Sequence, residues 1–283
     1  MKIGDVEVIQ LTEVECGAII QSGMPAATAE KLQTMDWLRP HYMENGKFKA
    51  WVQSFLIKTK DFTILVDTCN GNEKKRTDVP EWNNLRTAFL DKLKEHVQLE
   101  NIDYVLCTHL HMDHVGWNTT LVDGKWEPTF PNAKYLFAKK EFEYWQSQPE
   151  KEIADDHAGF ADSVLPVVQA NQALLVEADH KLCDEISFMP TPGHTPCHVS
   201  VNISSQGQEA IISGDMLHHP CQIADMTIGT VSDTYPEQAV STRQELFGKI
   251  ADTEVQLIGS HFADLVCGTI IKKEGKLEFK PTQ

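Results

Sequence analysis

The sequence has no long hydrophobic run: no stretch approaches the roughly 20 consecutive apolar residues that a membrane-spanning helix needs. The N-terminal segment MKIGDVEVIQLTEVE carries acidic residues where a signal peptide would carry its apolar core, so we expect no targeting segment. These two absences predict a soluble globular protein that has no membrane partner.

Basic residues are also scarce, with 25 Lys and Arg against 41 Asp and Glu, for a formal net charge of −16. Proteins that bind nucleic acids usually present a basic surface, because neutralisation of phosphate supplies most of their affinity. The charge balance therefore argues against nucleic acid as a partner.

The sequence shows no disulfide pattern. Its seven cysteines are an odd number, and none forms a CxxC pair, so we expect reduced thiols and a cytoplasmic location. A GxSxG elbow and a Gly-rich phosphate loop are missing too. A serine nucleophile and a nucleotide-phosphate loop are therefore not expected.

Short apolar runs that end in polar residues predict buried strands, since they are rich in β-branched and aromatic residues and are bounded by Gly, Pro, Asn or Asp. They lie at residues 55–59, 62–68, 102–109, 133–138, 186–194, 199–203, 209–215 and 255–261. Helix-like stretches lie at 81–96, 140–148 and 236–251. This mixture predicts an α/β protein, and we expect one domain over residues 1–283. Residues 16–53 show no clean period and are interpreted as an N-terminal arm or a surface excursion.

The segment THLHMDH, residues 108–114, places three histidines and an aspartate within six positions. In an extended chain, side chains two residues apart point to the same face, about 6.5–7 Å apart, so His109 and His111 can converge on one metal ion. Asp113 and His114 follow where the strand turns toward a helix, and their side chains would reach a second position nearby. Imidazole and carboxylate together suit zinc and its first-row neighbours.

Three further candidate ligands follow apolar strands elsewhere in the chain. His194 lies in TPGHTPCH after ISFM, Asp215 ends EAIISGD, and His261 ends VQLIGSH. Each residue taken singly has an ordinary structural interpretation as a turn residue or a strand-end cap. Their shared position after buried strands favours a common metal site.

This order of motifs, HxHxDH, then TPGHTP with another histidine, then SGD and a strand ending in GSH, resembles the metallo-β-lactamase superfamily over residues 55–262. The GW after the DH, the TPGHTP turn and a helix carrying TRQELF look most like the branch of homoserine-lactone lactonases and methyl parathion hydrolase. The resemblance implies a four-layer αββα sandwich, in which two sheets pack together with helices outside.

The resemblance also implies a dinuclear metal site and assigns its ligands. The first ion would be held by His109, His111 and His194, the second by Asp113, His114 and His261, with Asp215 bridging both. The chain departs from the family's turn at Cys197, where Gly is usual, but this leaves His194 in place. His198 would then support the site or the fold rather than bind metal.

Such a site predicts a dinuclear metal-dependent hydrolase. Two divalent ions, with Zn favoured and Mn, Fe or Co as alternatives, would activate a bridging hydroxide that attacks the carbonyl of a lactone or related ester. Asp113 would deliver a proton to the leaving group. Trp117 and Phe262 are either pocket walls for the substrate or parts of the core. We expect a small-molecule substrate, and a homodimer is possible.

Alternatives within the same fold remain open. The chain could be a phosphotriesterase similar to methyl parathion hydrolase, or another ester or thioester hydrolase. A redox protein of the flavodiiron type would carry an altered histidine set, whereas all seven ligand candidates are present here.

Overall fold

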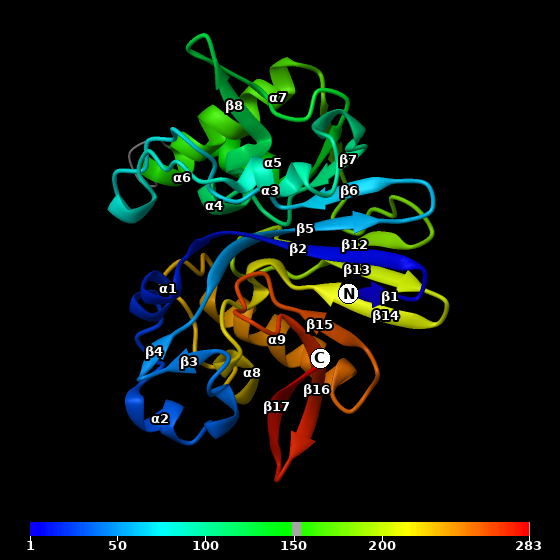
Figure 1. Ribbon diagram of the computed structural model, residues 1–283. Helices are drawn as coiled ribbons and strands as arrows, with labels where there is room; N and C mark the ends of the chain where they lie inside the picture. The colour runs from blue at the N-terminus through cyan, green and yellow to red at the C-terminus, as the bar shows by residue number, and fades with distance from the viewer. Residues whose placement is uncertain (149–153, 283) are drawn as a thin grey trace. The chain divides into compact units, whose positions relative to one another are not determined.

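All eight strand-like runs of the sequence contain a strand in the computed structural model, which describes residues 1–148 and 154–282 (Figure 1). The chain divides into two compact units. Unit 1 comprises Met1–Val14 and Val52–Ala178, and unit 2 comprises Glu15–Trp51 and Asp179–Gln283. The single domain over 1–283 and the arm at 16–53 stay predictions.

Unit 1 is built on a seven-stranded mixed sheet in the order β1-β2-β5-β6-β7-β10-β11. The strands are β1 (Lys2–Ile3), β2 (Val6–Glu15), β5 (Trp51–Lys58), β6 (Thr63–Val66), β7 (Tyr104–Leu106), β10 (Lys134–Ala138) and β11 (Ala173–Val176). From β6 to β11 the neighbours run parallel. Parallel strands end at the same edge of a sheet, so the residues that follow β6 and β7 lie close together.

The helices of unit 1 are short. They are α3 (Phe89–Lys94), α4 (Met112–Val115), α5 (Lys139–Ser147), α6 (Ala154–Gly159) and α7 (Leu165–Gln169), and a hairpin of β8 (Thr119–Val122) and β9 (Lys125–Pro128) completes the unit. The helix predicted at 81–96 was wrong in its first half, because that part holds only a 3-10 turn at Pro80–Trp82 and the α-helix begins at Phe89. Asn84 takes a left-handed φ of 54°, and the Asn72 side chain accepts the backbone N–H of Thr87, which draws this stretch into a loop.

Unit 2 contains a six-stranded sheet in chain order, antiparallel except for the parallel pair β14–β15. Its strands are β12 (Ile186–Pro190), β13 (Val199–Ser205), β14 (Gln208–Ile212), β15 (Gln256–Ile258), β16 (Cys267–Lys273) and β17 (Lys276–Pro281). The hairpin β3 (Met43–Glu44) and β4 (Lys47–Phe48) and the helices α1 (Gly17–Gly23), α2 (Ala29–Gln33) and α8 (Cys221–Ala224) also belong to it.

The crossover between β14 and β15 is the helix α9 (Pro236–Ile250), close to the prediction of 236–251. It buries the side chains that recur at three- and four-residue steps, Ala239, Arg243, Leu246 and Ile250. A parallel pair of strands requires a long connection, and α9 provides it. Among residues 1–148 and 154–282, no helix has both the length and the apolar character needed to cross a membrane.

Trp117 and Phe262 are core residues, which decides between the two interpretations that the sequence left open. Trp117 is buried, and its indole N–H donates to the Glu13 carboxylate at 2.6 Å. Phe262 is fully buried and packs edge-to-face against Tyr42 and Phe279. The substrate-facing apolar surface must be sought elsewhere.

Candidate metal-binding residues

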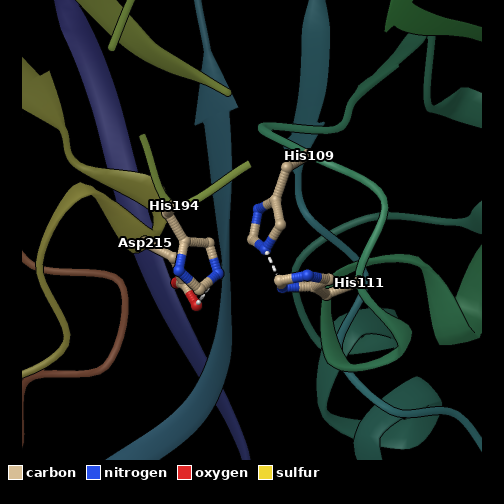
Figure 2. A group of neighbouring side chains, drawn as sticks. All are labelled: His109, His111, His194 and Asp215. Carbon is tan, nitrogen blue, oxygen red and sulfur yellow. Dashed lines mark hydrogen bonds and ion pairs between the residues drawn. The ribbon is translucent and has the colours of Figure 1, made fainter. Parts of the chain in front are cut away.

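The first group of candidate ligands lies in unit 1, just beyond the end of β7. His111 has extended backbone angles and directly precedes α4, whereas the chain bends at Thr108 and His109. The two side chains converge, and His109 Nε2 lies 2.9 Å from His111 Nδ1 (Figure 2).

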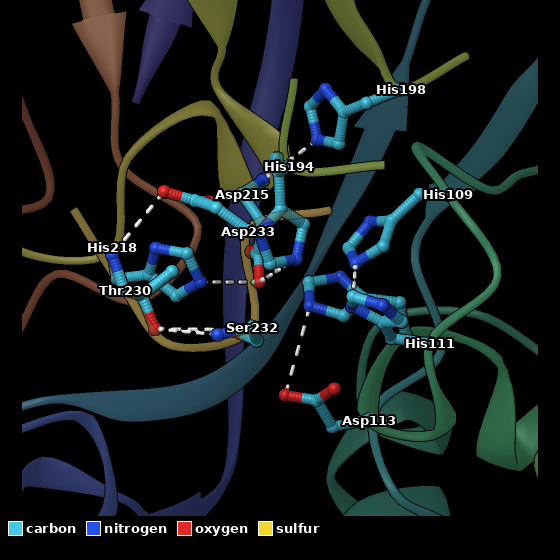
Figure 3. A network of polar contacts seen from close by, with 12 residues as sticks. His109, His111, Asp113, His194, His198, Asp215, His218, Thr230, Ser232 and Asp233 are labelled. Atoms are coloured by element: carbon cyan, nitrogen blue, oxygen red, sulfur yellow. Dashed lines mark hydrogen bonds and ion pairs between the residues drawn. The ribbon is translucent and has the colours of Figure 1, made fainter. Parts of the chain in front are cut away.

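Asp113 and His114 come from the first turn of α4, where the change from strand to helix redirects the side chains. His114 Nε2 lies 3.7 Å from Asp113 Oδ2. The rings of His109 and His114 have their centroids 4.2 Å apart. All four candidate side chains of unit 1 therefore gather beyond the carboxyl end of one strand, and Figure 3 shows three of them, His109, His111 and Asp113.

The carboxylate of Asp67, which follows β6, orients two of these histidines. Its Oδ2 accepts a hydrogen bond from His114 Nδ1 at 2.9 Å. It also accepts the hydroxyl of Thr108 at 2.9 Å, and that hydroxyl lies 3.1 Å from His109 Nδ1. Both imidazoles are thereby held with Nε2 directed away from the anchoring group, the arrangement commonly found for histidines that bind metals.

Helices α5 and α6 fix the backbone of the same loop. The Met112 N–H donates to the Asp156 carboxylate at 3.1 Å, and the Leu110 N–H reaches Glu141 Oε1 at 3.4 Å. Gly159 of α6 packs directly on Met112, where a Cβ would lie 3.0 Å from the Met112 Cα. The backbone of residues 110–112, between the candidate ligands, is therefore held by α5 and by α6.

The second group lies in unit 2 and converges on Asp215. This residue sits in a short 3-10 turn after β14, and Gly214 before it takes a left-handed φ of 52°. His194 Nε2 lies 3.4 Å from Asp215 Oδ2, and His261 Nε2 lies 3.0 Å from Asp215 Oδ1 (Figure 2). The three predicted ligands of unit 2 are thus brought together from three separate turns.

Both histidines of this group are also anchored through Nδ1. His194 Nδ1 donates to Asp233 Oδ1 at 3.1 Å (Figure 3), and His261 Nδ1 donates to the Trp51 carbonyl at 2.9 Å. Burial lowers the pKa of His261, but the Asp215 carboxylate more than reverses this, and the net shift is well upward. The position therefore attracts a positive charge, which a divalent cation can supply in place of a proton.

Two other histidines of unit 2 differ, because both of their ring nitrogens are used. His198 Nε2 accepts the N–H of Asp215 at 2.8 Å, and its Nδ1 donates to the Thr191 carbonyl at 3.1 Å. His219 accepts the Cys221 N–H at Nδ1 and donates from Nε2 to the Tyr42 carbonyl. Both residues are structural, as expected for His198 from the sequence.

His218 is the third imidazole at Asp215, and the sequence left its role open. Its Nε2 lies 3.0 Å from Asp215 Oδ2, and its ring is parallel to that of His261, with centroids 5.7 Å apart. The Nδ1 atom of His218 is buried and has no hydrogen-bond partner in the described part of the chain. His218 can therefore hold the Oδ2 atom of Asp215 while His261 contacts Oδ1.

The chemistry of the donors fits divalent cations of the zinc type. In both units the candidate donors are imidazole nitrogens and carboxylate oxygens, the ligands that zinc and its neighbours bind. His109, His114, His194 and His261 are each anchored through Nδ1, and each directs Nε2 at another candidate ligand. The residues of each unit thus fit their proposed role as metal ligands.

Three functional side chains were missed by the sequence analysis: Asp67, Asp156 and Asp233. Asp67 carried a usable signal, since it follows the buried run ILV as Asp215 follows AII. Asp156 and Asp233 lie in a helix and a loop that have no motif of their own. Their roles arise from contacts distant in sequence, of 44 residues for Asp156 with Met112 and 39 for Asp233 with His194.

Comparison with known families gives one clear match: the model described as metallo-beta-lactamase superfamily covers residues 52–257. Among curated proteins, the N-acyl homoserine lactonases of Bacillus cereus and of a Bacillus sp are 23% and 24% identical to the chain over 167 and 168 residues. Each of these matches covers 55% of the chain and 59% of the relative, so the chain spans about three fifths of the length of these relatives.

Solved structures resemble the whole chain. The hydrolase AbOPH of the beta lactamase superfamily has a TM-score of 0.82 at 20% identity, and the dizinc quorum-quenching lactonase AidC has 0.79 at 22%; each match covers 100% of this chain and 96% of the other. A probable metal-dependent hydrolase from Staphylococcus aureus has 0.77 at 19%, with both chains fully covered. The expected α/β fold of the metallo-β-lactamase type is confirmed, and each unit contains one large sheet, a small hairpin and its own helices.

Proposed function

The chain belongs to the metallo-β-lactamase superfamily, and on that premise we propose that it is a hydrolase that uses two divalent metal ions to cleave a lactone or related ester. The observation that carries the proposal is the anchoring of His109, His114, His194 and His261 through Nδ1. Anchoring of one ring nitrogen fixes the orientation of the imidazole, so that Nε2 points at the other candidate ligands, as is usual for histidines that bind metals.

The proposed ligands divide as the family resemblance implies. One ion would be bound by His109, His111 and His194, the other by Asp113, His114 and His261, and Asp215 would be shared. We propose zinc as the metal, since these donors suit it and AidC is a dizinc enzyme by its description. We also propose a cytoplasmic location, in keeping with the seven cysteines, which form no disulfide in the described residues. A homodimer is part of the same proposal.

When bound, the ions would supply activation of water and stabilisation of negative charge on the substrate. The chain's own residues complete the reaction. A hydroxyl from water adds to the carbonyl carbon, the carbon–oxygen bond of the ester breaks, and Asp113 gives the leaving oxygen a proton taken from the same water. Asp215, held by His218 and by its own backbone bond to His198, keeps its carboxylate in place through this sequence.

A lactone is the proposed substrate because the curated relatives are named N-acyl homoserine lactonases. The net charge of −16 disfavours polyanionic substrates such as nucleic acids. The test combines elemental analysis of the purified protein with a panel of lactones, alkyl esters, a thioester and a phosphotriester. We expect about two zinc ions per chain, with lactones as the best substrates.

Asp215→Ala should lose at least one metal ion and nearly all activity. A folded Asp215→Ala protein with full metal content and normal turnover would contradict the proposed site. Faster hydrolysis of the phosphotriester than of any lactone would instead assign the chain to the phosphotriesterases. Turnover that survives exhaustive chelation would exclude both assignments.

A further inference from the structure

Residues 229–235 of unit 2 form a loop that is fixed on both sides by backbone hydrogen bonds. The Val231 N–H donates to the Gly23 carbonyl of α1, and the Tyr235 N–H donates to the Gly193 carbonyl, each at 2.8 Å. Within the loop, the Asp233 carboxylate accepts the Thr230 N–H at 3.2 Å (Figure 3). The side chains of this loop are therefore presented from a braced backbone.

Two large apolar side chains project from this loop into solvent. Among the described residues of unit 2, the large apolar side chains that are exposed are Val231, at 76%, and Tyr235, at 49%. Packing does not require either of them, since neither contributes to the buried core. Apolar side chains that a braced loop holds in solvent offer an apolar contact surface, which a ligand's apolar part gains by covering.

A pocket of about 620 Å³ that is open to solvent lies at the same place, lined by Thr234, Tyr235, Pro236, Glu237 and Gln238. This volume is within the range of small-molecule sites. Tyr235 and Pro236 supply its apolar side, and the pocket adjoins a candidate metal ligand, because the Thr234 N–H donates to the carbonyl of His194 at 2.9 Å.

We propose that Val231 and Tyr235 determine substrate specificity by binding the non-reacting part of the ester, and that this part is an uncharged apolar chain. The inference rests on the proposed function, because it places the reacting ester group near His194. Asp233 links the two roles, since it orients His194 and belongs to the same loop that carries Val231 and Tyr235.

The charge around the pocket selects against anionic chains. Glu237 lines it directly. A carboxylate on the substrate's side chain would face Glu237 in a protein of net charge −16. An alkyl chain meets no such repulsion and gains contact with the tyrosine ring and the valine.

The experiment uses zinc-loaded enzyme and γ-lactones whose alkyl side chains have zero, two and five carbons. For the wild type, kcat/KM should rise with chain length. The ratio of kcat/KM for the longest lactone to that for the unsubstituted one should fall about tenfold in Tyr235→Ser and several-fold in Val231→Ser, since apolar contact is lost. Tyr235→Phe should keep the ratio, because the ring remains.

Val122→Ser is the matched control, since Val122 is 42% exposed on the β8–β9 hairpin of unit 1. A second readout does not depend on turnover: saturation-transfer NMR on metal-free protein with the five-carbon lactone should show transfer to the alkyl protons. That transfer should weaken in Tyr235→Ser and Val231→Ser but not in Val122→Ser.

The outcomes separate the two proposals. If the metal-loaded wild type hydrolyses no lactone while the alkyl chain still contacts the protein through Tyr235, the proposed function fails and the apolar site stands. If lactones are hydrolysed but the chain-length ratio is the same in wild type, Tyr235→Ser and Val231→Ser, the site is overturned. A collapse of turnover in Tyr235→Phe would also overturn it, because the hydroxyl would then be the essential group.

Discussion

His198 Nε2 accepts the backbone N–H of Asp215 at 2.8 Å, and this bond explains how a histidine next to the TPGH turn serves the site without binding a metal. The opposite ring nitrogen, Nδ1, donates to the Thr191 carbonyl, so the imidazole is a rigid brace between two turns of unit 2. The orientation of the Asp215 carboxylate follows from the position of its backbone. His198 thus acts on the proposed site through Asp215.

Replacement of His198 by alanine should weaken metal binding without removing any ligand. We expect metal affinity to fall by about 10–100-fold, the usual effect of losing a group that orients a ligand. His198→Gln should restore part of the affinity, since an amide can accept the Asp215 N–H. The measurement is metal retained per folded chain after dialysis against a graded chelator. Undiminished retention in a folded His198→Ala protein would show that Asp215 needs no such brace.

Asp233→Asn tests the orientation of His194. The amide keeps the size of the carboxylate but loses its charge, so Nδ1 of His194 is held less firmly and its Nε2 becomes a weaker ligand. We expect about a tenfold or greater loss of affinity for one of the two ions. Asp225→Asn is the matched control, because Asp225 caps Thr227 and pairs with Lys31 without contacting a candidate ligand. Equal metal loss in both variants would contradict the assignment.

The candidate ligands could be predicted from the sequence because they lie a few residues beyond buried strands or in the THLHMDH motif that follows one. His109 follows β7, Asp215 follows β14 and His261 follows β15, so the apolar run that precedes each residue in the sequence indicates its position. The strands themselves were predictable for the same reason, since all eight apolar runs contain one. These are features that neighbouring residues encode.

The supporting groups could not be predicted, because their roles depend on contacts between distant segments. Nothing near Asp233 in the sequence indicates that its carboxylate will meet an imidazole 39 residues earlier. The exposed ring of Tyr235 is a similar case, since only the structure distinguishes a tyrosine on a braced loop from one in the core. Trp117 and Phe262 show the converse, as aromatic residues beside the motifs that proved to be buried.

Asp113→Asn tests the proposed proton donor. Alkoxide leaving groups need a proton and nitrophenolate does not, so kcat for a lactone should fall by about 100-fold or more while kcat for a 4-nitrophenyl ester falls much less. Rates are compared at equal metal content, because Asp113 is also a proposed ligand. Asp123→Asn is the control: Asp123 occupies a hairpin turn at φ 48°, which asparagine tolerates. Equal losses on both substrates would remove the proton-transfer role.

His219 should make the protein less stable in mild acid. Burial lowers the pKa of His219 to about 4, against about 6.5 in an unfolded chain. Between these two pKa values the unfolded state binds more protons than the folded state. The contribution of the neutral His219 side chain to stability is therefore complete above pH 6.5 and is lost as the pH falls toward 4. The loss amounts to roughly 3 kcal/mol at most.

The measurement is the free energy of unfolding in urea between pH 7.5 and 4.5, for wild type and His219→Gln at the same zinc concentration. Every other titrating group is common to the two proteins, so the difference between their pH profiles isolates His219. The variant is expected to be less stable at pH 7.5, because the ring stacked on Phe48 at 3.8 Å is gone, but to lose less stability on acidification. His96→Gln, at an exposed position, should follow the wild type. Parallel pH profiles for wild type and His219→Gln would mean that the buried imidazole is protonated without loss of folding free energy. The hydrogen bonds of His219 with Tyr42 and Cys221 would then have to rearrange in acid.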